Sequence, residues 1–448
     1  MEVCPLDYRY GSDAMRELFS EDGRLKRMLE VEAALARAQA QLGMIPAPAA
    51  LAITEAARSG RVTAARVNEL EEQIKHDIMA LVRALSEQCG EAGAYVHLGA
   101  TSNDIIDTAT ALQLKEAWPH LERGVRAVRD ELARLAMEHR GTLQIGRTHG
   151  QWALPTTFGL KMAVYALEMD RHLERLEQAY PRVVVGKFMG AVGTGAAMGP
   201  HAIEVQRLVL EDLGLIVPIA TLQTTQRDRH AELACMLANI ATSLEKFATE
   251  VRNLQRSEIA EVGEYFDPKK QVGSSTMAHK RNPISAENVC GLARVVRGMV
   301  VPAFENVPLW HERDLTNSSA ERFTISHSIV LTDYILGRSV RLFRQLQVNA
   351  ERMRENLERA GPDVMAESVM MALVAKGLGR QDAHELIRAA SMRSAQRGGR
   401  ALAEELMAEP RVAERLTRGE LDSSLDPRSY TGSAERIVEL ALEHISKH

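Results

Sequence analysis

Aromatic residues and prolines are both scarce in this chain of 448 residues. Phe, Trp and Tyr together make up 4% of the sequence, and only 15 prolines occur. Both values are low for an all-β protein, because strands favour aromatic side chains and turns use proline. With 45% hydrophobic and 26% charged residues, the composition is that of a globular protein. We therefore predict an all-α fold.

A basic excess is also absent. Lys and Arg number 55 against 60 Asp and Glu, which gives a formal net charge of −5. Proteins whose main partner is a nucleic acid usually carry a clustered positive charge that neutralises phosphates. The charge balance therefore argues against nucleic acid as the main partner.

Cysteine patterns and long apolar runs are missing as well. Cys4, Cys89, Cys235 and Cys290 are far apart and show no CxxC or Cys/His ligand spacing, so neither a disulfide framework nor a zinc site is indicated. The uncharged stretches 38–54 and 188–203 are broken by proline or glycine and cannot span a membrane. The start MEVCPLDYRYG lacks the basic flank and apolar run of a secretory signal. We expect a cytoplasmic protein with no membrane partner.

Proline-free windows run over 49–118, 219–267 and 309–361, and each can hold long helices. Helices of about 30 residues would reach about 45 Å, longer than a small domain needs. One-sided apolar stripes support this prediction: Ile325, Ile329, Leu336, Val340 and Phe343 form one, and Leu244, Phe247, Val251 and Leu254 form another. A helix cannot bury such a stripe without neighbours, which indicates a bundle, shared between subunits.

Boundaries near Thr101 and at Gly361-Pro362 divide the chain into three predicted domains. They are an N-terminal helical domain at 1–101, a central long-helix bundle at 102–360 and a C-terminal helical domain at 361–448. Glycines and prolines cluster in four loops of the central part, at 141–150, 181–200, 263–283 and 302–317, and most of the candidate chemistry falls there. One of these loops, at 263–283, carries the most informative motif.

That motif is GSSTMAHKRNP, residues 273–283. Asn282 as N-cap with Pro283 at the first helical position is a common helix start. The loop therefore brings Lys280 and Arg281 to a helix N-terminus, where free amides and the helix dipole favour anions. An anionic substrate site is one interpretation, and a surface loop with ordinary capping is the other.

Histidines mark two further segments. His149 lies between glycines in GRTHGQ, a setting that can expose an imidazole able to act as a general acid near neutral pH. In Lys75-His76-Asp77, adjacent imidazole and carboxylate groups could orient each other or a partner. Purely structural roles are the alternative for both segments.

Hydroxyl groups and arginines mark two more. Thr101 and Ser102, in HLGATSND, could bind a carboxylate or simply cap the following helix. WHERDLTNSSAER, residues 310–322, puts Arg313, Ser318 and Arg322 within reach of a phosphate, although a solvated charged face is also possible. Glycines in KFMGAVGTGAAMG follow the order GxxGxG without a βαβ setting, which excludes a Rossmann site.

Taken together, these motifs resemble the fumarase/aspartase superfamily, whose signature loop is GSSxMPxKxNP. Within it, the strings GRTHGQ, PTTFG, RDRHAE and WHERDLTNSSAER, with the opening DYRYG and KHD, are similar to the adenylosuccinate lyase family over nearly the whole chain. Two positions depart from the family pattern. Ala278 stands where the signature usually has Pro, and Asn317 stands where many relatives have His.

The resemblance implies β-elimination of fumarate from adenylosuccinate, giving AMP, and from succinylaminoimidazole-carboxamide ribotide in purine biosynthesis. It implies that Ser274 is the base and His149 the acid, that Lys280 stabilises developing negative charge, and that His76 assists. No metal or organic cofactor is required. The substrate-binding residues that it implies are Arg9, Tyr10, Lys75, Asp77, Thr101, Ser102, Gln223, Ser275, Arg281, Asn282, Arg313, Ser318 and Arg322.

The superfamily also implies a homotetramer with a multi-helix core, in which several chains build each site. Three alternatives stay open at this point. The chain could be another fumarate-releasing lyase, such as argininosuccinate lyase, a non-catalytic helical protein that kept the scaffold, or an anion-binding module. A non-catalytic protein would have lost catalytic residues, whereas the sequence retains Ser274, His149 and Lys280. An anion-binding module would bind AMP without releasing fumarate.

Overall fold

A computed structural model describes residues 3–267, 277 and 279–447. Their contacts group the chain into two compact units. Unit 1 comprises Met1–Arg126, Arg171–Lys246 and Asn288–Arg338, and unit 2 comprises Ala127–Asp170, Phe247–Glu287 and Ser339–His448. The long helices contribute residues to both units. The division into three domains stays a prediction.

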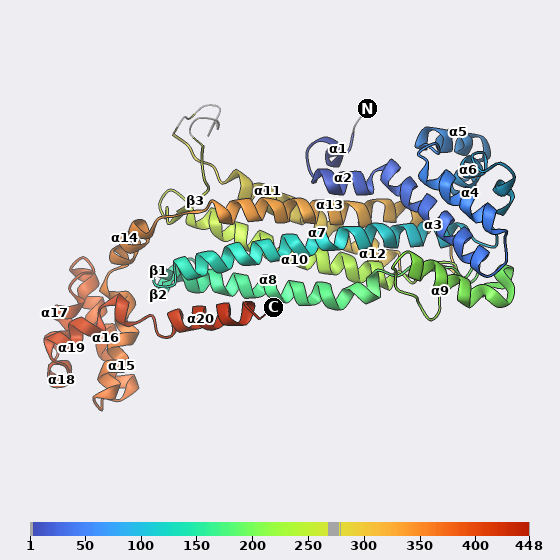
Figure 1. The fold of residues 1–448 in the computed structure, drawn as a ribbon. Helices are drawn as coiled ribbons and strands as arrows, with labels where there is room; N and C mark the ends of the chain where they lie inside the picture. The colour runs from blue at the N-terminus through green and yellow to red at the C-terminus, as the bar shows by residue number, and fades with distance from the viewer. Residues whose placement is uncertain (1–2, 268–276, 278, 448) are drawn as a thin grey trace. The chain divides into compact units, whose positions relative to one another are not determined.

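Helices dominate the described residues, as the sequence predicted (Figure 1). The four longest are α7 (Ser102–Glu138), α8 (Phe158–Val183), α10 (Asp228–Leu254) and α13 (Thr316–Arg344). The preceding ones are α1 (Pro5–Tyr8), α2 (Asp13–Phe19), α3 (Glu21–Gln41), α4 (Ala47–Arg58), α5 (Ala64–Ile74) and α6 (Asp77–Ser86). Between the long helices lie α9 (Ala202–Asp212), α11 (Ile284–Gly298) and α12 (Val300–Glu305).

The chain ends in α14 (Ala350–Ala360), α15 (Ala366–Ala375), α16 (Arg380–Gln396), α17 (Leu402–Met407), α18 (Pro410–Ala413), α19 (Arg418–Ser424) and α20 (Ala434–Ile445). Short 3₁₀ turns are η1 (Gly90–Tyr95), η2 (Ala196–His201), η3 (Pro362–Met365) and η4 (Pro427–Ser429). Among the described residues, no helix combines the length and the apolar character needed to cross a membrane.

The predicted apolar stripes are buried except at Val340, which is partly exposed. Leu244, Phe247, Val251 and Leu254 on α10 and Ile329, Leu336 and Phe343 on α13 are nearly inaccessible to solvent. Within unit 1, a side-chain carbon added at Gly124 of α7 would lie 3.0 Å from Leu336, so these helices pack closely. Within unit 2, the rings of Phe247 and Phe343 meet edge to face.

Proline does not end the long helices where the sequence indicated. The proline-free window stops at Trp118, yet α7 continues through Pro119 to Glu138. A proline inside a helix loses one backbone hydrogen bond. Trp118 and Leu121 on either side are almost fully buried, and this burial outweighs the lost bond.

Each terminal region has its own apolar core. In unit 1, helices α3 to α6 enclose a cluster that includes Leu29, Ile53 and Leu81. In unit 2, helices α15 to α19 enclose another around Leu373, Leu402 and Leu421. The unit 1 core includes Leu81 of α6, the helix that His76 caps and Asp77 begins.

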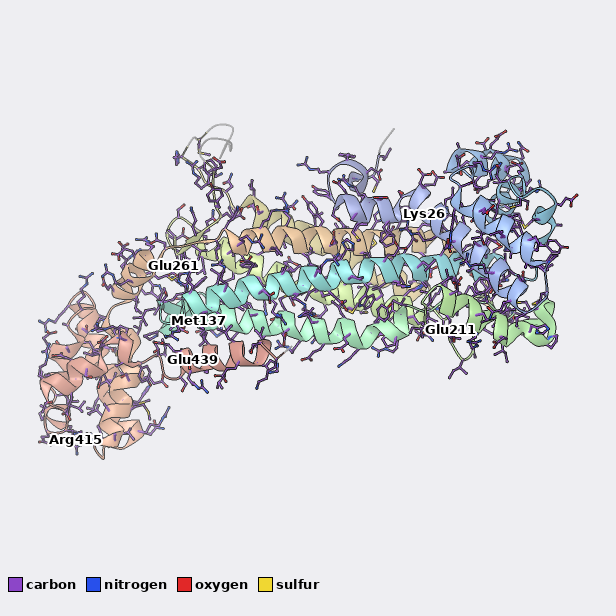
Figure 2. All side chains as sticks on the ribbon, in the orientation of Figure 1. Lys26, Met137, Glu211, Glu261, Arg415 and Glu439 are labelled. Carbon is purple, nitrogen blue, oxygen red and sulfur yellow. The ribbon has the colours of Figure 1, made fainter. Side chains whose placement is uncertain are left out.

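Two small antiparallel sheets lie in unit 2. β1 (Leu143–Thr148) pairs with β2 (Gln151–Thr157), and β3 (Val262–Gly263) pairs with β4 (Gln347–Val348). The sequence predicted a loop over 141–150, so the β1–β2 hairpin is a correction. Glu261, labelled in Figure 2, directly precedes β3.

Candidate active site

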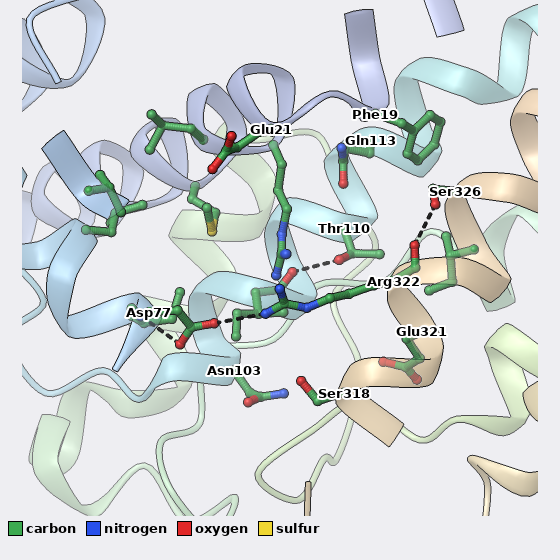
Figure 3. A pocket seen from close by; sticks show the side chains of 18 of the residues that line it. Phe19, Glu21, Asp77, Asn103, Thr110, Gln113, Ser318, Glu321, Arg322 and Ser326 are labelled. Atoms are coloured by element: carbon green, nitrogen blue, oxygen red, sulfur yellow. Dashed lines mark hydrogen bonds and ion pairs between the residues drawn. The ribbon is translucent and has the colours of Figure 1, made fainter. Parts of the chain in front are cut away.

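A cavity of about 420 Å³ opens in unit 1, where α3, α5, α6, α7 and the start of α13 meet. Four residues that the sequence singled out line it: Asp77, Arg313, Ser318 and Arg322. Figure 3 shows Arg322 and Asp77 facing each other in the cavity, joined by an ion pair of 3.5 Å. The structure therefore brings together residues that are up to 245 positions apart.

The start of α13 presents the cationic and hydroxyl groups. Ser318 and Arg322 are four positions apart on its first turns and therefore share one helix face. The turn before the helix is fixed by Asp314, whose carboxylate accepts from the backbone N–H groups of Trp310 and Thr316, each at 2.8 Å. This turn carries Arg313.

Arg313 has unused hydrogen-bonding capacity. Its Nη1 donates to Oε1 of Gln223 at 3.2 Å, which places a further predicted residue in contact with Arg313, although Gln223 does not itself line the cavity. Its Nε is buried and has no partner among the described residues. Burial and then the charge of Arg227 lower the pKa of the guanidinium. An arginine in this state favours an incoming anion, which would provide both the missing acceptor and the missing charge.

Residues of the Lys75-His76-Asp77 motif cap two helices. Lys75 ends α5 in the left-handed region, with φ 56°. His76 is the N-cap of α6, and its Nδ1 accepts from the N–H of Met79 at 3.3 Å. Its Nδ1 is thus an acceptor, so a neutral ring carries its proton on Nε2. Asp77 begins α6, and its Oδ2 forms the ion pair with Arg322.

Thr101 and Ser102 lie where α7 begins. The N–H of Thr101 donates to Asp104 at 2.8 Å, which is the carboxylate half of a capping box. Asp104 also forms a fully buried ion pair of 2.6 Å with Lys187. Because Lys187 donates to the carbonyl oxygen of Gln223 at 2.7 Å, this pair ties the Thr101 turn to the Gln223 loop.

A second buried ion network borders the cavity, which two of its members, Arg227 and Glu321, line, and sequence reasoning missed it. The guanidinium of Arg227, 3% exposed, donates to Asp107 at 2.7 Å and to Glu321 at 2.7 Å. Burial alone would raise the pKa of Asp107. The charge and hydrogen bonds of Arg227 outweigh burial and lower that pKa to about 2. The sequence offered no clear signal, because Asn103, Asp104 and Thr110 share the helix face of Asp107 and make it polar.

The N-terminal pair of predicted residues lies in unit 1 but not among the residues that line this cavity. Tyr10 packs edge to face on Tyr334, with ring centroids 5.6 Å apart. Arg9 lies over the ring of Tyr10 at 5.8 Å and is exposed. Both side chains therefore remain available to a ligand.

His149 belongs to unit 2, at the tip of the β1–β2 hairpin. Thr148 pairs with Gln151, so His149 and Gly150 form a two-residue turn. Both have positive φ, 55° and 74°, as a type I′ turn requires. The imidazole is exposed, as the sequence predicted.

Glu261 anchors this hairpin. Its fully buried carboxylate accepts from Nη2 of Arg147 at 2.5 Å and from Nε2 of Gln144 at 2.6 Å, both on β1. It also accepts from Nδ2 of Asn356 at 2.9 Å. Arg147 is two residues from His149, so the acid candidate stands on an anchored element.

Lys280, Arg281 and Asn282 line an open hollow of about 910 Å³ in unit 2, together with Arg252 and Arg256. Arg281 stacks over the ring of Phe266 at 3.7 Å. Ser274 and Ser275, the predicted base and its neighbour, lie outside the described residues, as does Ala278.

The start of α11 differs from the sequence prediction. The helix begins at Ile284, so Pro283 is not its first residue. The N–H groups of Ser285 and Ala286 donate to the carboxylate of Glu264, at 3.0 and 2.7 Å. The expectation that these amides are free for a substrate anion is therefore wrong, because Glu264 already occupies them.

The chain matches two family models. A family model described as Lyase matches residues 7–298, and one described as Adenylosuccinate lyase C-terminus matches residues 362–441. The chain is 49% identical to an adenylosuccinate lyase of Methanothermobacter thermautotrophicus, over 100% of both chains. It is 51% identical to that of Pyrococcus horikoshii, over 100% of this chain and 99% of the relative.

Solved structures agree with the helical fold. A fumarate lyase from a Mesorhizobium species is 38% identical with a TM-score of 0.89, covering 97% of this chain and 98% of that one. A 3-carboxy-cis,cis-muconate lactonizing enzyme from Pseudomonas putida is 36% identical with a TM-score of 0.90, covering 99% of both chains. The all-α prediction is confirmed, and the chain belongs to the adenylosuccinate lyase family.

Proposed function

We propose that the enzyme cleaves adenylosuccinate into AMP and fumarate, and releases fumarate in the same way from succinylaminoimidazole-carboxamide ribotide in purine nucleotide biosynthesis. The observation that carries this conclusion is the identity of about half of all positions to adenylosuccinate lyases along the whole chain. Both reactions are β-eliminations that break a carbon–nitrogen bond of a succinyl group.

Arg313, Ser318 and Arg322 bind the nucleotide phosphate in this proposal. Support comes from their position in one cavity and from the unpartnered Nε of Arg313. Arginine can hold a phosphate with two parallel charge-assisted hydrogen bonds, which fixes both position and orientation. Asp77 holds Arg322 loosely, at 3.5 Å, so a dianionic phosphate can displace it. Arg9, Tyr10 and Lys75 complete the phosphate end.

The elimination needs a base, an acid and cations. Ser274 removes the proton next to a succinyl carboxylate, the electrons of that bond form the double bond of fumarate, and His149 protonates the departing nitrogen. Lys280 stabilises the developing negative charge. Thr101, Ser102, Gln223, Ser275, Arg281 and Asn282 hold the succinyl carboxylates, and His76 orients the acid. The imidazole of His149 is exposed and stands on an anchored hairpin, which supports its role as the acid.

The enzyme is proposed to work as a homotetramer with shared sites. Large apolar side chains stay exposed on the surface of unit 1, among them Val301 at 65% and Phe304 at 55%. Apolar surface of this kind favours association with further copies. We also propose that it resides in the cytoplasm, as its four thiols without disulfides support.

An ultraviolet assay for fumarate tests the function. Wild-type enzyme should release fumarate from adenylosuccinate but not from argininosuccinate, and Ser274→Ala should lose activity by at least about a hundredfold. Ser446→Ala, in the last turn of the chain, is the matched control and should behave as wild type. Turnover of argininosuccinate alone would refute the substrate, and unchanged turnover in Ser274→Ala would refute the base.

Mixing tests the shared site. Ser274→Ala and His149→Ala proteins, each inactive, should regain activity when they are dissociated and reassembled together, because some sites then receive both intact residues. Persistent inactivity in mixed tetramers verified by mass spectrometry would contradict sharing.

A further inference from the structure

The glycine-rich segment KFMGAVGTGAAMG, residues 187–199, begins at a buried ion pair, and the proposed function gives neither of them a role. Lys187 is the first residue of the segment. It lies 2.6 Å from Asp104 of α7, and both side chains are 0% exposed. A buried ion pair adds little net stability compared with apolar residues of the same size, because both charges must leave water. The pair therefore calls for another explanation.

Hydrogen bonds satisfy both members of this pair. The ammonium group of Lys187 has three protons and three acceptors, namely Asp104 and the carbonyl oxygens of Gly190 and Gln223, at 2.6, 3.2 and 2.7 Å. The carboxylate of Asp104 also accepts from three backbone N–H groups, those of Thr101, Met189 and Gly190, at 2.8, 3.1 and 3.2 Å. Such a fully satisfied network is rigid. Because both side chains are buried and saturated, neither can bind a substrate itself.

The glycines of the segment allow neighbouring loops to approach it closely. Gly193 has φ 83°, and a side-chain carbon there would lie 2.0 Å from the carbonyl oxygen of Thr221. Gly99, in the turn before α7, has φ 72°, and a side-chain carbon there would lie 3.2 Å from Cγ of Met198. Glycine adopts such φ values without strain and leaves room for these contacts. The segment is therefore packed between the turn before α7 and the loop at 221–223.

The two loops that the ion pair ties together carry unused hydrogen-bond donors. Within the described part of the chain, the hydroxyl groups of Thr101 and Ser102 have no hydrogen-bond partner. Gln223 uses its Oε1, which accepts from Arg313 at 3.2 Å, and its amide NH₂ group has no acceptor among the same residues. All three donor side chains are partly exposed. Hydroxyl and amide donors suit the carboxylates of a succinyl group.

We propose that Lys187 and Asp104 are positioning residues of the elimination, which hold these three donor side chains in the arrangement that the succinyl carboxylates require. The proposal rests on the proposed function and deepens it by giving the glycine-rich segment a role. It predicts a selective defect. Loss of the ion pair should weaken binding at the succinyl end and spare the phosphate end, because Arg322 lies on α13 and Asp314 fixes the turn that carries Arg313.

Calorimetry with two ligands that do not react measures this selectivity without turnover. AMP reports on the phosphate end, and succinate titrated into AMP-saturated enzyme reports on the carboxylate end. In Asp104→Asn, an NH₂ group replaces one oxygen and opposes backbone N–H donors. The dissociation constant for succinate should rise about tenfold or more, since small displacements of binding groups have large effects. That for AMP should stay within about threefold of wild type.

The proposal would be overturned if both ligands bind equally more weakly in Asp104→Asn, if neither does, or if wild-type enzyme binds AMP but not succinate. Asp170→Asn is the matched control. Asp170 forms a buried ion pair of 2.8 Å with Arg129 in unit 2, and its partners Arg129 and His444 lie outside the predicted site. The control should also lose stability but bind both ligands as wild type does. Weaker succinate binding in the control would reveal a general effect of lost stability and refute the assignment.

A double variant covers the case in which the single change prevents folding. Lys187→Met combined with Asp104→Asn leaves no charge buried, so its melting temperature should exceed that of Asp104→Asn. Succinate should still bind weakly, because the carbonyl oxygen of Gln223 has lost its donor. Wild-type affinity for succinate in the folded double variant would refute the positioning role.

Turnover separates this proposal from the proposed function. If wild-type enzyme releases fumarate from adenylosuccinate while Asp104→Asn binds succinate normally, the positioning role fails and the function stands. If no fumarate is released but succinate binding depends on the ion pair, the function fails and the pair still positions a dicarboxylate site.

Discussion

Replacing Arg227 by Met should destabilise the protein strongly. Arg227 is 3% exposed and neutralises Asp107 and Glu321, themselves largely buried. Removing one partner of a buried ion pair costs about 3–5 kcal/mol, because it leaves an uncompensated charge. The pKa of Asp107, about 2 against an ordinary 3.8, independently indicates a stabilisation of about 2 kcal/mol at neutral pH.

The pH dependence identifies the cause. In wild type the depressed pKa of Asp107 contributes stability that is present above pH 3.8 and is lost as the pH falls toward 2. In Arg227→Met, Asp107 stays buried but loses its main counter-ion, so the pKa of the same carboxyl should rise relative to wild type. Lowering the pH from 7.5 to 5 should therefore protonate Asp107 in the variant only, and the destabilisation should shrink by about 1 kcal/mol or more.

Urea unfolding at fixed protein concentration, at pH 7.5 and at pH 5, measures this difference. Arg207→Met is the control, because Arg207 forms ion pairs with Glu204 and Glu211 on the surface of α9. Its effect should be small at both pH values. An equal loss of unfolding free energy at both pH values in Arg227→Met would refute the electrostatic reasoning and leave only lost packing.

Two further variants test the site. Arg313→Lys should raise KM for adenylosuccinate about tenfold with little change in kcat, because an ammonium group cannot replace the planar guanidinium. Steady-state kinetics measure both constants. An unchanged KM would contradict the role of Arg313 in phosphate binding. Glu261→Gln should lower both the melting temperature and kcat at constant KM, since Arg147 loses its buried partner at the base of the His149 hairpin. If the melting temperature falls while kcat stays at the wild-type value, Glu261 anchors the hairpin but does not support catalysis.

Much of the fold was predictable from apolar spacing. The stripes on α10 and α13 are buried as the 3.6-residue period indicates. The course of α7 through Pro119 was not predictable, because the lost hydrogen bond is compensated by tertiary burial of Trp118. Local sequence signals contain no information on such long-range packing.

The candidate site was predictable in composition and less so in geometry. Arg313, Ser318 and Arg322 share a cavity as the sequence indicated. The hairpin was missed because His-Gly is an unusual two-residue turn, whereas Asn-Gly or Asp-Gly would have marked it. Glu264 was missed as the cap of α11 because it lies about 20 positions before the helix, and only the folded chain brings it there.

The two-residue turn at His149 limits how this part of the sequence can change. Side chains along a strand alternate between opposite faces, and Gln144 and Arg147 both reach Glu261 only because an irregularity between Ile145 and Arg147 shifts the register. Inserting or deleting one residue there would turn one of the two side chains away from Glu261. Substitutions in the hairpin alter one side chain at a time and leave the imidazole at the tip. Changes of strand length would move it altogether, so this segment should accept new residue types far more readily than a new number of residues.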